Sequence, residues 1–131
     1  MAGELILIVE DNERNRKLVR DVLRFKGYQT IEVETGEESL RLARDRRPSL
    51  ILMDIRLPGI DGIAALRRLR ADPATQGIPV MAMTASIMTA GPEEMRAAGF
   101  DGYQSKPLQV REFLAAVERL LKKPDVSGGT P

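Results

Sequence analysis

Short apolar runs alternate with amphipathic stretches along the chain, and this alternation constrains the fold more than any other feature. The runs at residues 5–9, 50–53 and 79–83 are apolar throughout, which is typical of parallel strands covered on both faces. Weaker runs at 29–33 and 102–105 complete a series of five predicted strands. Strict alternation of strands and helices predicts a parallel sheet with right-handed crossovers and helices on both faces.

Helical periodicity occupies the segments between these runs. Apolar side chains recur at helical spacing in residues 18–23 and again in 110–121. A helix start lies at residues 91–94 (Gly-Pro-Glu-Glu), which place proline at the first helical position and acids in the first turn. We therefore predict a short helix over 92–98 and a longer loop over 85–90.

Composition removes most of the usual catalytic groups. The chain has 131 residues, which suits one domain, and it contains no histidine, cysteine or tryptophan. It therefore has no Ser-His-Asp triad, cysteine nucleophile, thiolate or imidazole zinc site, or disulfide framework. Any chemistry rests on carboxylates, hydroxyls, lysine or arginine, and any metal is a hard cation bound by oxygen.

The charge balance and the ends of the chain set further expectations. Lys and Arg number 20 against 19 Asp and Glu, and a net charge of +1 argues against a nucleic-acid partner. The apolar run at residues 5–9 is too short for a signal or membrane segment, so we expect a cytoplasmic protein with no membrane partner. Residues 124–131 are rich in Pro, Gly and Ser and are predicted to be a disordered tail.

Polar side chains follow four of the predicted strands. Glu10 and Asp11 come after the first strand, Asp54 after the third, Thr84 after the fourth and Lys106 after the fifth. An open parallel sheet places its functional site at the carboxyl ends of its strands, so these groups converge on one edge. Each alone has a plain structural interpretation, such as a helix cap or a surface lysine, but chance rarely arranges the whole set.

Three clustered carboxylates repel one another, and this repulsion indicates a metal. Glu10, Asp11 and Asp54 would store unfavourable charge energy that Lys106 alone cannot neutralise. Mg²⁺ with several retained waters suits one or two carboxylates and a phosphate. The chemistry that fits is a carboxylate nucleophile attacking a phosphoryl group, with Thr84 as a hydrogen-bond donor to the transferred group.

The motifs at these positions resemble a known family. Residues 7–12 (Leu-Ile-Val-Glu-Asp-Asn), 52–62 (Leu-Met-Asp-Ile-Arg-Leu-Pro-Gly-Ile-Asp-Gly), 83–85 (Met-Thr-Ala) and 99–108 (Gly-Phe-Asp-Gly-Tyr-Gln-Ser-Lys-Pro-Leu) look like the response-regulator receiver domain of two-component signalling. The resemblance covers about residues 4–123 and is highest to DivK-type single-domain regulators and the receivers of hybrid histidine kinases. It implies a doubly wound α/β fold, a CheY-like three-layer (βα)5 sandwich with a parallel sheet in strand order 2-1-3-4-5.

The resemblance also assigns roles to residues. Asp54 would be the phosphoacceptor, and Glu10, Asp11, Asp54 and the backbone carbonyl of Arg56 would hold Mg²⁺, Glu10 largely through water. Lys106 would contact the phosphoryl group, placed by a cis bond to Pro107. Thr84 would be the switch hydroxyl and Tyr103 the switch aromatic. By this resemblance the protein would be a phosphoacceptor signalling module whose only catalysis is its own phosphotransfer and autodephosphorylation.

Partners follow from the same resemblance. The phosphoryl donor would be a sensor histidine kinase or a histidine-phosphotransfer protein, because this chain has no histidine of its own. The output would be contact with a downstream protein through the fourth helix, fifth strand and fifth helix, which phosphorylation remodels.

Two other functions stay open at this point. A haloacid-dehalogenase-like phosphatase also uses an Asp nucleophile on a parallel sheet, but it needs an acid two residues later, where this chain has Arg56. The other is an adaptor of the same fold that works without phosphorylation. Arg56 itself has two interpretations, as a cation that reaches the phosphoryl group or as a solvated side chain pairing with acids such as Asp61.

Overall fold

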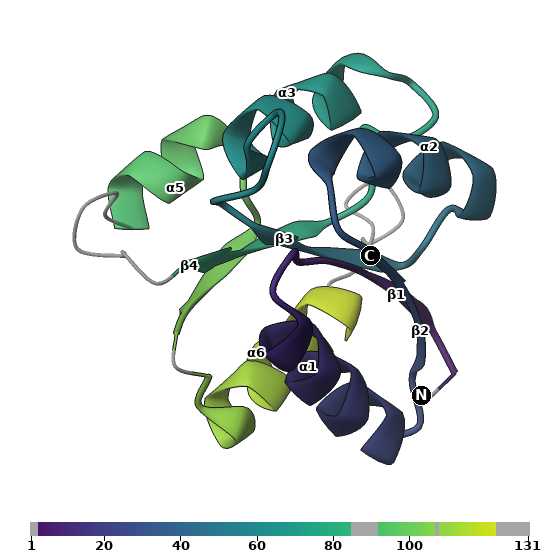
Figure 1. Cartoon of the computed structure of the whole chain (residues 1–131), viewed down its shortest axis with the longest axis vertical. Helices are drawn as coiled ribbons and strands as arrows, with labels where there is room; N and C mark the ends of the chain where they lie inside the picture. Colours follow the sequence, from purple (N-terminus) through teal and green to yellow (C-terminus); the bar gives the residue numbers. More distant parts are fainter. Residues whose placement is uncertain (1–2, 85–91, 107, 123–131) are drawn as a thin grey trace, which may run out of the picture.

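Five parallel strands form one sheet at the centre of the molecule (Figure 1). The computed structural model describes residues 3–84, 92–106 and 108–122. The strands in chain order are β1 (Leu5–Val9), β2 (Gln29–Val33), β3 (Leu50–Asp54), β4 (Val80–Thr84) and β5 (Gly102–Ser105). They pair in the order β2-β1-β3-β4-β5, all parallel, which confirms the predicted topology.

Helices cover both faces of this sheet, which makes the three-layer sandwich expected from the sequence. α1 (Glu13–Phe25) and α6 (Val110–Lys122) lie on one face, and α2 (Gly36–Arg46), α3 (Gly62–Ala71) and α5 (Pro92–Ala98) lie on the other (Figure 1). The bounds of α5 are those predicted from its proline and first-turn acids. None of the described helices is long and apolar enough to cross a membrane.

Two apolar cores, one on each face of the sheet, hold the layers together. β1, β3 and β4 are buried almost throughout, and their side chains alternate between the two cores. The core beneath α2 and α3 contains Leu7, Val9, Val33, Ala43, Ile51, Met53, Ala65, Leu66, Leu69, Val80, Ala82 and Phe100. The core beneath α1 and α6 contains Ile6, Ile8, Val19, Leu23, Leu50, Leu52, Met81, Met83, Phe113, Ala116, Val117 and Leu120.

Side-chain caps begin three helices near the carboxyl edge of the sheet. Asn12 accepts a hydrogen bond from the amide of Asn15 and starts α1. Thr35 accepts from the amide of Glu38 and starts α2, and Asp61 accepts from the amide of Ala64 and starts α3. Because each cap satisfies an otherwise unpaired amide, the loops that lead into these helices have defined paths.

Three predictions concern residues beyond this description. The loop over 85–90, the peptide bond between Lys106 and Pro107, and the tail at 124–131 all lie, wholly or in part, outside the described residues.

Candidate phosphoryl-transfer and metal site

The carboxyl edge of the sheet brings the sequence-predicted residues together. Asp54 and Thr84 are the last residues of β3 and β4. Each of these strands therefore extends one residue beyond the apolar run that predicted it. Glu10 follows β1 directly, and its amide bonds to the carbonyl of Val33. All three residues are buried, at 4–6% exposure. The strands therefore deliver acidic and hydroxyl groups to one edge of the sheet, just below the surface of the molecule.

Lys106 links the two buried acids. Its Nζ donates to Glu10 Oε1 at 2.8 Å and lies 3.3 Å from Asp54 Oδ2. The backbone of Lys106 is fixed as well, because its amide donates to the carbonyl of Thr84 at 2.8 Å. The lysine side chain is only 16% exposed, so the ammonium is held in place between the carboxylates.

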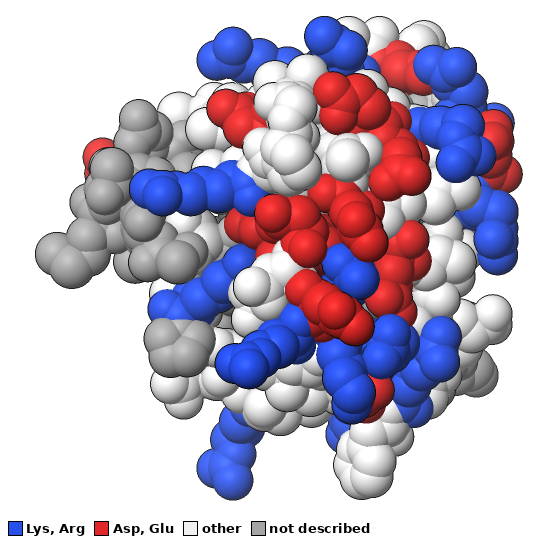
Figure 2. Space-filling view, viewed as in Figure 1, with Lys and Arg blue, Asp and Glu red and all other residues white. Residues whose placement is uncertain are grey.

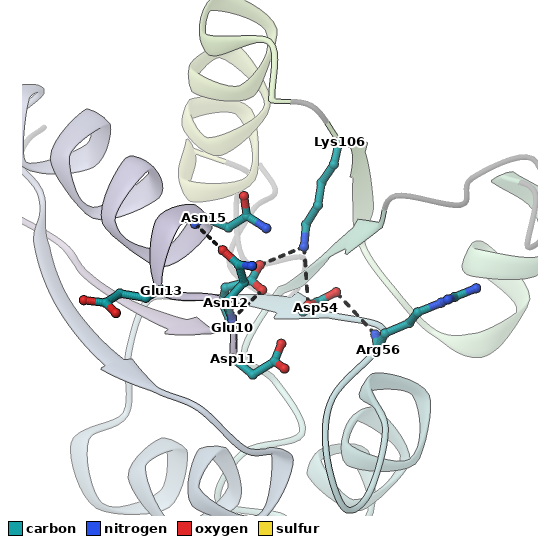
Figure 3. A pocket seen from close by; sticks show the side chains of 8 residues that line it. All are labelled: Glu10, Asp11, Asn12, Glu13, Asn15, Asp54, Arg56 and Lys106. Atoms are coloured by element: carbon teal, nitrogen blue, oxygen red, sulfur yellow. Dashed lines mark hydrogen bonds and ion pairs between the residues drawn. The ribbon is translucent and has the colours of Figure 1, made fainter.

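A polar cleft of about 500 Å³ opens onto these groups. It is lined by Glu10, Asp11, Asn12, Glu13, Asn15, Asp54, Arg56 and Lys106. In Figure 3, Lys106 reaches toward Glu10 and Asp54, and the carboxylate of Asp11 lies on the other side of the same space. The guanidinium of Arg56 extends away from Asp54 in this view, while its backbone amide donates to Asp54 Oδ1 at 3.3 Å.

The surroundings of Asp54 shift its acidity. Burial, followed by the charge of Glu10 and a hydrogen bond with it, raises the pKa of Asp54 to about 6, and Lys106 and the Arg56 amide only partly oppose this. The pKa of Lys106 is also raised: burial favours the neutral amine, but the hydrogen bond to Glu10 and the charges of Asp54 and Glu10 outweigh it. The site therefore holds the Lys106 ammonium between acids that repel one another.

The acids fit a hard metal ion. Glu10, Asp11 and Asp54 each offer a carboxylate oxygen, and these oxygens lie within 4.8 Å of one another. Oxygen donors of this charge suit Mg²⁺, which binds through one or two carboxylates and keeps several waters. Asp11 is exposed whereas Glu10 and Asp54 are buried, so the open side of the cluster faces the cleft. A divalent cation there would relieve the repulsion that raises the pKa of Asp54.

Thr84 and Tyr103 share one face of the sheet. Tyr103 pairs with Ala82 across β4 and β5, and both belong to the core beneath α2 and α3. Since side chains alternate along a strand, Thr84 lies on the same face as Ala82. Tyr103 is half-buried. The hydroxyl and the aromatic ring predicted to act together are therefore on the same side of the sheet.

Charge is segregated although the net charge is close to zero. Figure 2 shows carboxylates gathered at the centre of this face of the molecule, with lysine and arginine side chains around them. The acidic members described above come from the ends of β1 and β3. The site attracts cations locally in a chain whose formal charge is only +1.

Sequence reasoning missed Arg16, which contacts the site from α1. Its Nη1 donates to the backbone carbonyl of Glu10 at 3.0 Å. In the sequence it is one arginine among many on a polar helix face, and no local pattern marks it. The polar residue Glu32 inside the second strand is the one signal that a cation lies nearby, because Arg16 pairs with it at 3.3 Å.

Comparison with known proteins identifies the family to which this chain is similar. The model of the response regulator receiver domain family matches residues 6–118. The polar-differentiation response regulator DivK of Brucella anthropi is 44% identical over 116 residues, which cover 88% of this chain and 94% of the relative. DivK of Brucella ovis is 43% identical over the same length and shares of the two chains.

Solved structures show the same relationship. The receiver domain of a sensor histidine kinase from Pseudomonas aeruginosa, solved with a magnesium ion coordinated in its active site cleft, superposes with a TM-score of 0.85 at 36% identity over 92% of this chain and 98% of that one. The receiver domain of a histidine kinase from Syntrophus aciditrophicus gives 0.81 at 31% identity over 98% of both chains. With its sheet order, its acidic edge and these matches, the chain belongs to the response regulator receiver domain family of two-component signalling.

Proposed function

We propose that this chain accepts a phosphoryl group on Asp54 from a phosphohistidine of a partner protein. The observation that carries the proposal is the pairing of Asp54 with Lys106 beside Glu10 and Asp11, at the mouth of an open cleft. The carboxylate is the nucleophile that this arrangement offers, since the cleft gives a phosphoryl donor access to it and the Lys106 ammonium lies 3.3 Å away.

Mg²⁺ is the proposed cofactor of this reaction. Asp11, Asp54 and the backbone carbonyl of Arg56 would hold the ion, and Glu10 would act largely through water. When bound, the ion neutralises charge on the transferred phosphoryl group. Lys106 would also balance charge on this group, because its ammonium already lies 3.3 Å from Asp54.

The transfer exchanges one bond to phosphorus for another. An Asp54 oxygen attacks phosphorus, a P–O bond forms, and the P–N bond of the protonated phosphohistidine breaks. The products are an aspartyl phosphate on this chain and a neutral imidazole on the partner. The donor is a sensor histidine kinase or a histidine-phosphotransfer protein, since the chain itself contains no histidine.

The proposed output is a change of protein contacts. The Thr84 hydroxyl donates a hydrogen bond to the phosphoryl group, and Tyr103 turns further inward behind it, on the sheet face that they share. This movement remodels the surface formed by α5, β5 and α6, where a downstream protein binds. The unit that switches is residues 4–123, acting in the cytoplasm as a signalling module and not as an enzyme with turnover.

Intact mass spectrometry after incubation with acetyl phosphate and Mg²⁺ tests the proposal. We expect the addition of one phosphoryl group to the wild type, and no addition in EDTA or in Asp54→Asn. Asp61→Asn is the matched control, because Asp61 also precedes α3 and asparagine caps a helix as well as aspartate does. It should be labelled like the wild type.

Four outcomes would contradict the proposal. A label that persists in Asp54→Asn would place the acceptor elsewhere, and a label that forms equally well in EDTA would remove the metal from the reaction. An unlabelled wild type would favour an adaptor that works without phosphorylation. Hydrolysis of phosphate esters with turnover would instead favour the phosphatase.

A further inference from the structure

Arg16 holds three partners at the edge of the acidic cleft. Its Nη1 donates to the carbonyl oxygen of Glu10 at 3.0 Å, its Nε lies 3.3 Å from Glu32 Oε1, and its Nη2 lies 3.5 Å from Glu34 Oε2. The side chain is 15% exposed, so the guanidinium is packed in place. Its planar fork of donors suits several simultaneous acceptors, which a lysine could not satisfy in the same way.

The carbonyl that Arg16 holds belongs to the peptide unit between Glu10 and Asp11. A peptide unit is planar, so fixing its oxygen also fixes the direction in which the chain enters Asp11. Glu10 is further restrained through its side chain, which accepts from the amide of Asn12 at 3.2 Å and from Lys106 at 2.8 Å. Arg16 therefore restrains the backbone that carries two of the three clustered acids.

The anchor for this restraint lies outside the cleft. Glu32 is in β2, and Glu34 follows that strand. Both pair with Arg16, so the guanidinium joins the loop after β1 to the carboxyl end of the neighbouring strand. Their negative charges also offset that of Arg16, which limits its effect on the charge of the cleft.

We propose that Arg16 is a positioning residue for Mg²⁺, which orients Glu10 and Asp11 through the peptide unit that joins them. The inference rests on the proposed function, because it takes these acids to be the metal site. Hydrogen-bond partners of metal ligands typically change metal affinity by about 10–100-fold when they are removed.

A purely electrostatic role predicts the opposite sign. Removing a cation next to an acidic cluster makes the cluster more negative, and Mg²⁺ would then bind more tightly. Loss of positioning makes Mg²⁺ bind more weakly, because the acids are then no longer held in the binding geometry and must be ordered when the ion binds. The direction of the change therefore separates the two roles without reference to its size.

Isothermal titration with Mg²⁺ alone tests the inference, with Arg20 as a matched control. Arg20 lies on the same helix and donates to the same Glu32, but among the described residues it makes no hydrogen bond to Glu10. We expect Mg²⁺ to bind Arg16→Gln about tenfold more weakly than the wild type. Arg20→Gln should bind within about twofold of the wild type, because it loses an ion pair and leaves the peptide unit held.

A second measurement covers the case in which Arg16→Gln folds poorly. Amide hydrogen exchange, measured by NMR in EDTA, should be faster at Asp11 and Asn12 in Arg16→Lys than in Arg20→Lys, because a lysine keeps the charge and loses the fork. Equal exchange in the two lysine variants would overturn the inference and leave the proposed function standing. Unchanged or tighter Mg²⁺ binding by Arg16→Gln would do the same. A wild type that binds no Mg²⁺ would overturn the proposed site and the inference with it.

Discussion

At the scale of single residues, the surroundings of Asp54 disfavour its ionised form. Glu10 faces it from the end of β1, and Lys106 and the Arg56 amide oppose the effect of Glu10 from the ends of β5 and β3. Burial and Glu10 prevail and raise the pKa of Asp54 to about 6. Asp54 is then more protonated in the folded chain than in the unfolded chain between about pH 4 and pH 6, so its contribution to the free energy of unfolding falls as pH rises through that range.

Asp54→Asn should therefore stabilise the metal-free protein near neutral pH. We expect its free energy of unfolding to exceed that of the wild type by about 1 kcal/mol at about pH 7.5, which is less than the full shift because the cleft is solvated and the pair with Lys106 is lost. The difference should shrink as pH falls and vanish at about pH 3, where the carboxyl is protonated in both states. Urea unfolding in EDTA at the two pH values measures it. A loss of stability in Asp54→Asn near neutral pH would contradict the assigned electrostatics.

The predictability of single residues depends on whether their neighbours are set by topology. Asp54, Thr84 and Lys106 could be placed together from sequence because each stands at a strand end, and strand ends of a parallel sheet meet. Arg16 could not, because its contacts depend on the rotation of α1 and on the register of β2 against β1. The cap that Asp61 forms on α3 was likewise not predicted, because it depends on the exact residue at which that helix begins.

At the scale of elements, the close approach of α3 to β3 fixes the end of the strand that carries Asp54. Gly62 is the first residue of α3 and is buried against the backbone at the end of β3. A Cβ at this position would collide with the carbonyl oxygen of Asp54 and would lie 2.9 Å from the Cα of Ile55. Both contacts are with backbone, so a neighbouring side chain cannot relieve them by turning away.

Gly62→Ala should push the end of β3 away from α3. We expect a loss of about 2–3 kcal/mol in the free energy of unfolding, typical of an overpacked core. Mg²⁺ affinity should also fall, since Asp54 moves with its backbone. Gly77→Ala is the control, because a Cβ there meets nothing within 4 Å. Its stability should stay within about 0.5 kcal/mol of the wild type. Equal stability of the two variants, measured by urea unfolding, would show that the end of β3 yields freely.

Element boundaries were predictable where a strong local signal coincided with burial. The proline and acids at the start of α5 gave its bounds, and the three apolar strands stood out because both of their faces are covered. The ends of β3 and β4 each extend one residue beyond the apolar run, to Asp54 and Thr84. Apolar patterning could not include these residues, because their polar side chains serve the site and not the core.

At the scale of the whole molecule, the sheet separates two cores, and the proposed switch residues belong to one side of it. Tyr103 packs in the core beneath α2 and α3, and Thr84 shares its sheet face. Phe113 and Leu120 pack in the other core, beneath α1 and α6. Close-packed cores transmit small displacements to their own neighbours, so a movement at Thr84 and Tyr103 should spread within their side of the sheet first.

Phosphorylation should therefore perturb the two cores unequally. With acetyl phosphate and Mg²⁺, we expect NMR shift changes at Ala82, Tyr103 and Phe100 to be larger than those at Phe113 and Leu120. Thr84→Val keeps the shape of the side chain and removes its hydroxyl, so it should retain phosphorylation by intact mass while the shift changes on the Tyr103 side shrink. Thr84→Ser keeps the hydroxyl and should preserve them. Equal perturbation of both cores would mean that the shared sheet face does not direct the change. A full response in Thr84→Val would mean that the Thr84 hydroxyl is not needed to carry the change away from Asp54.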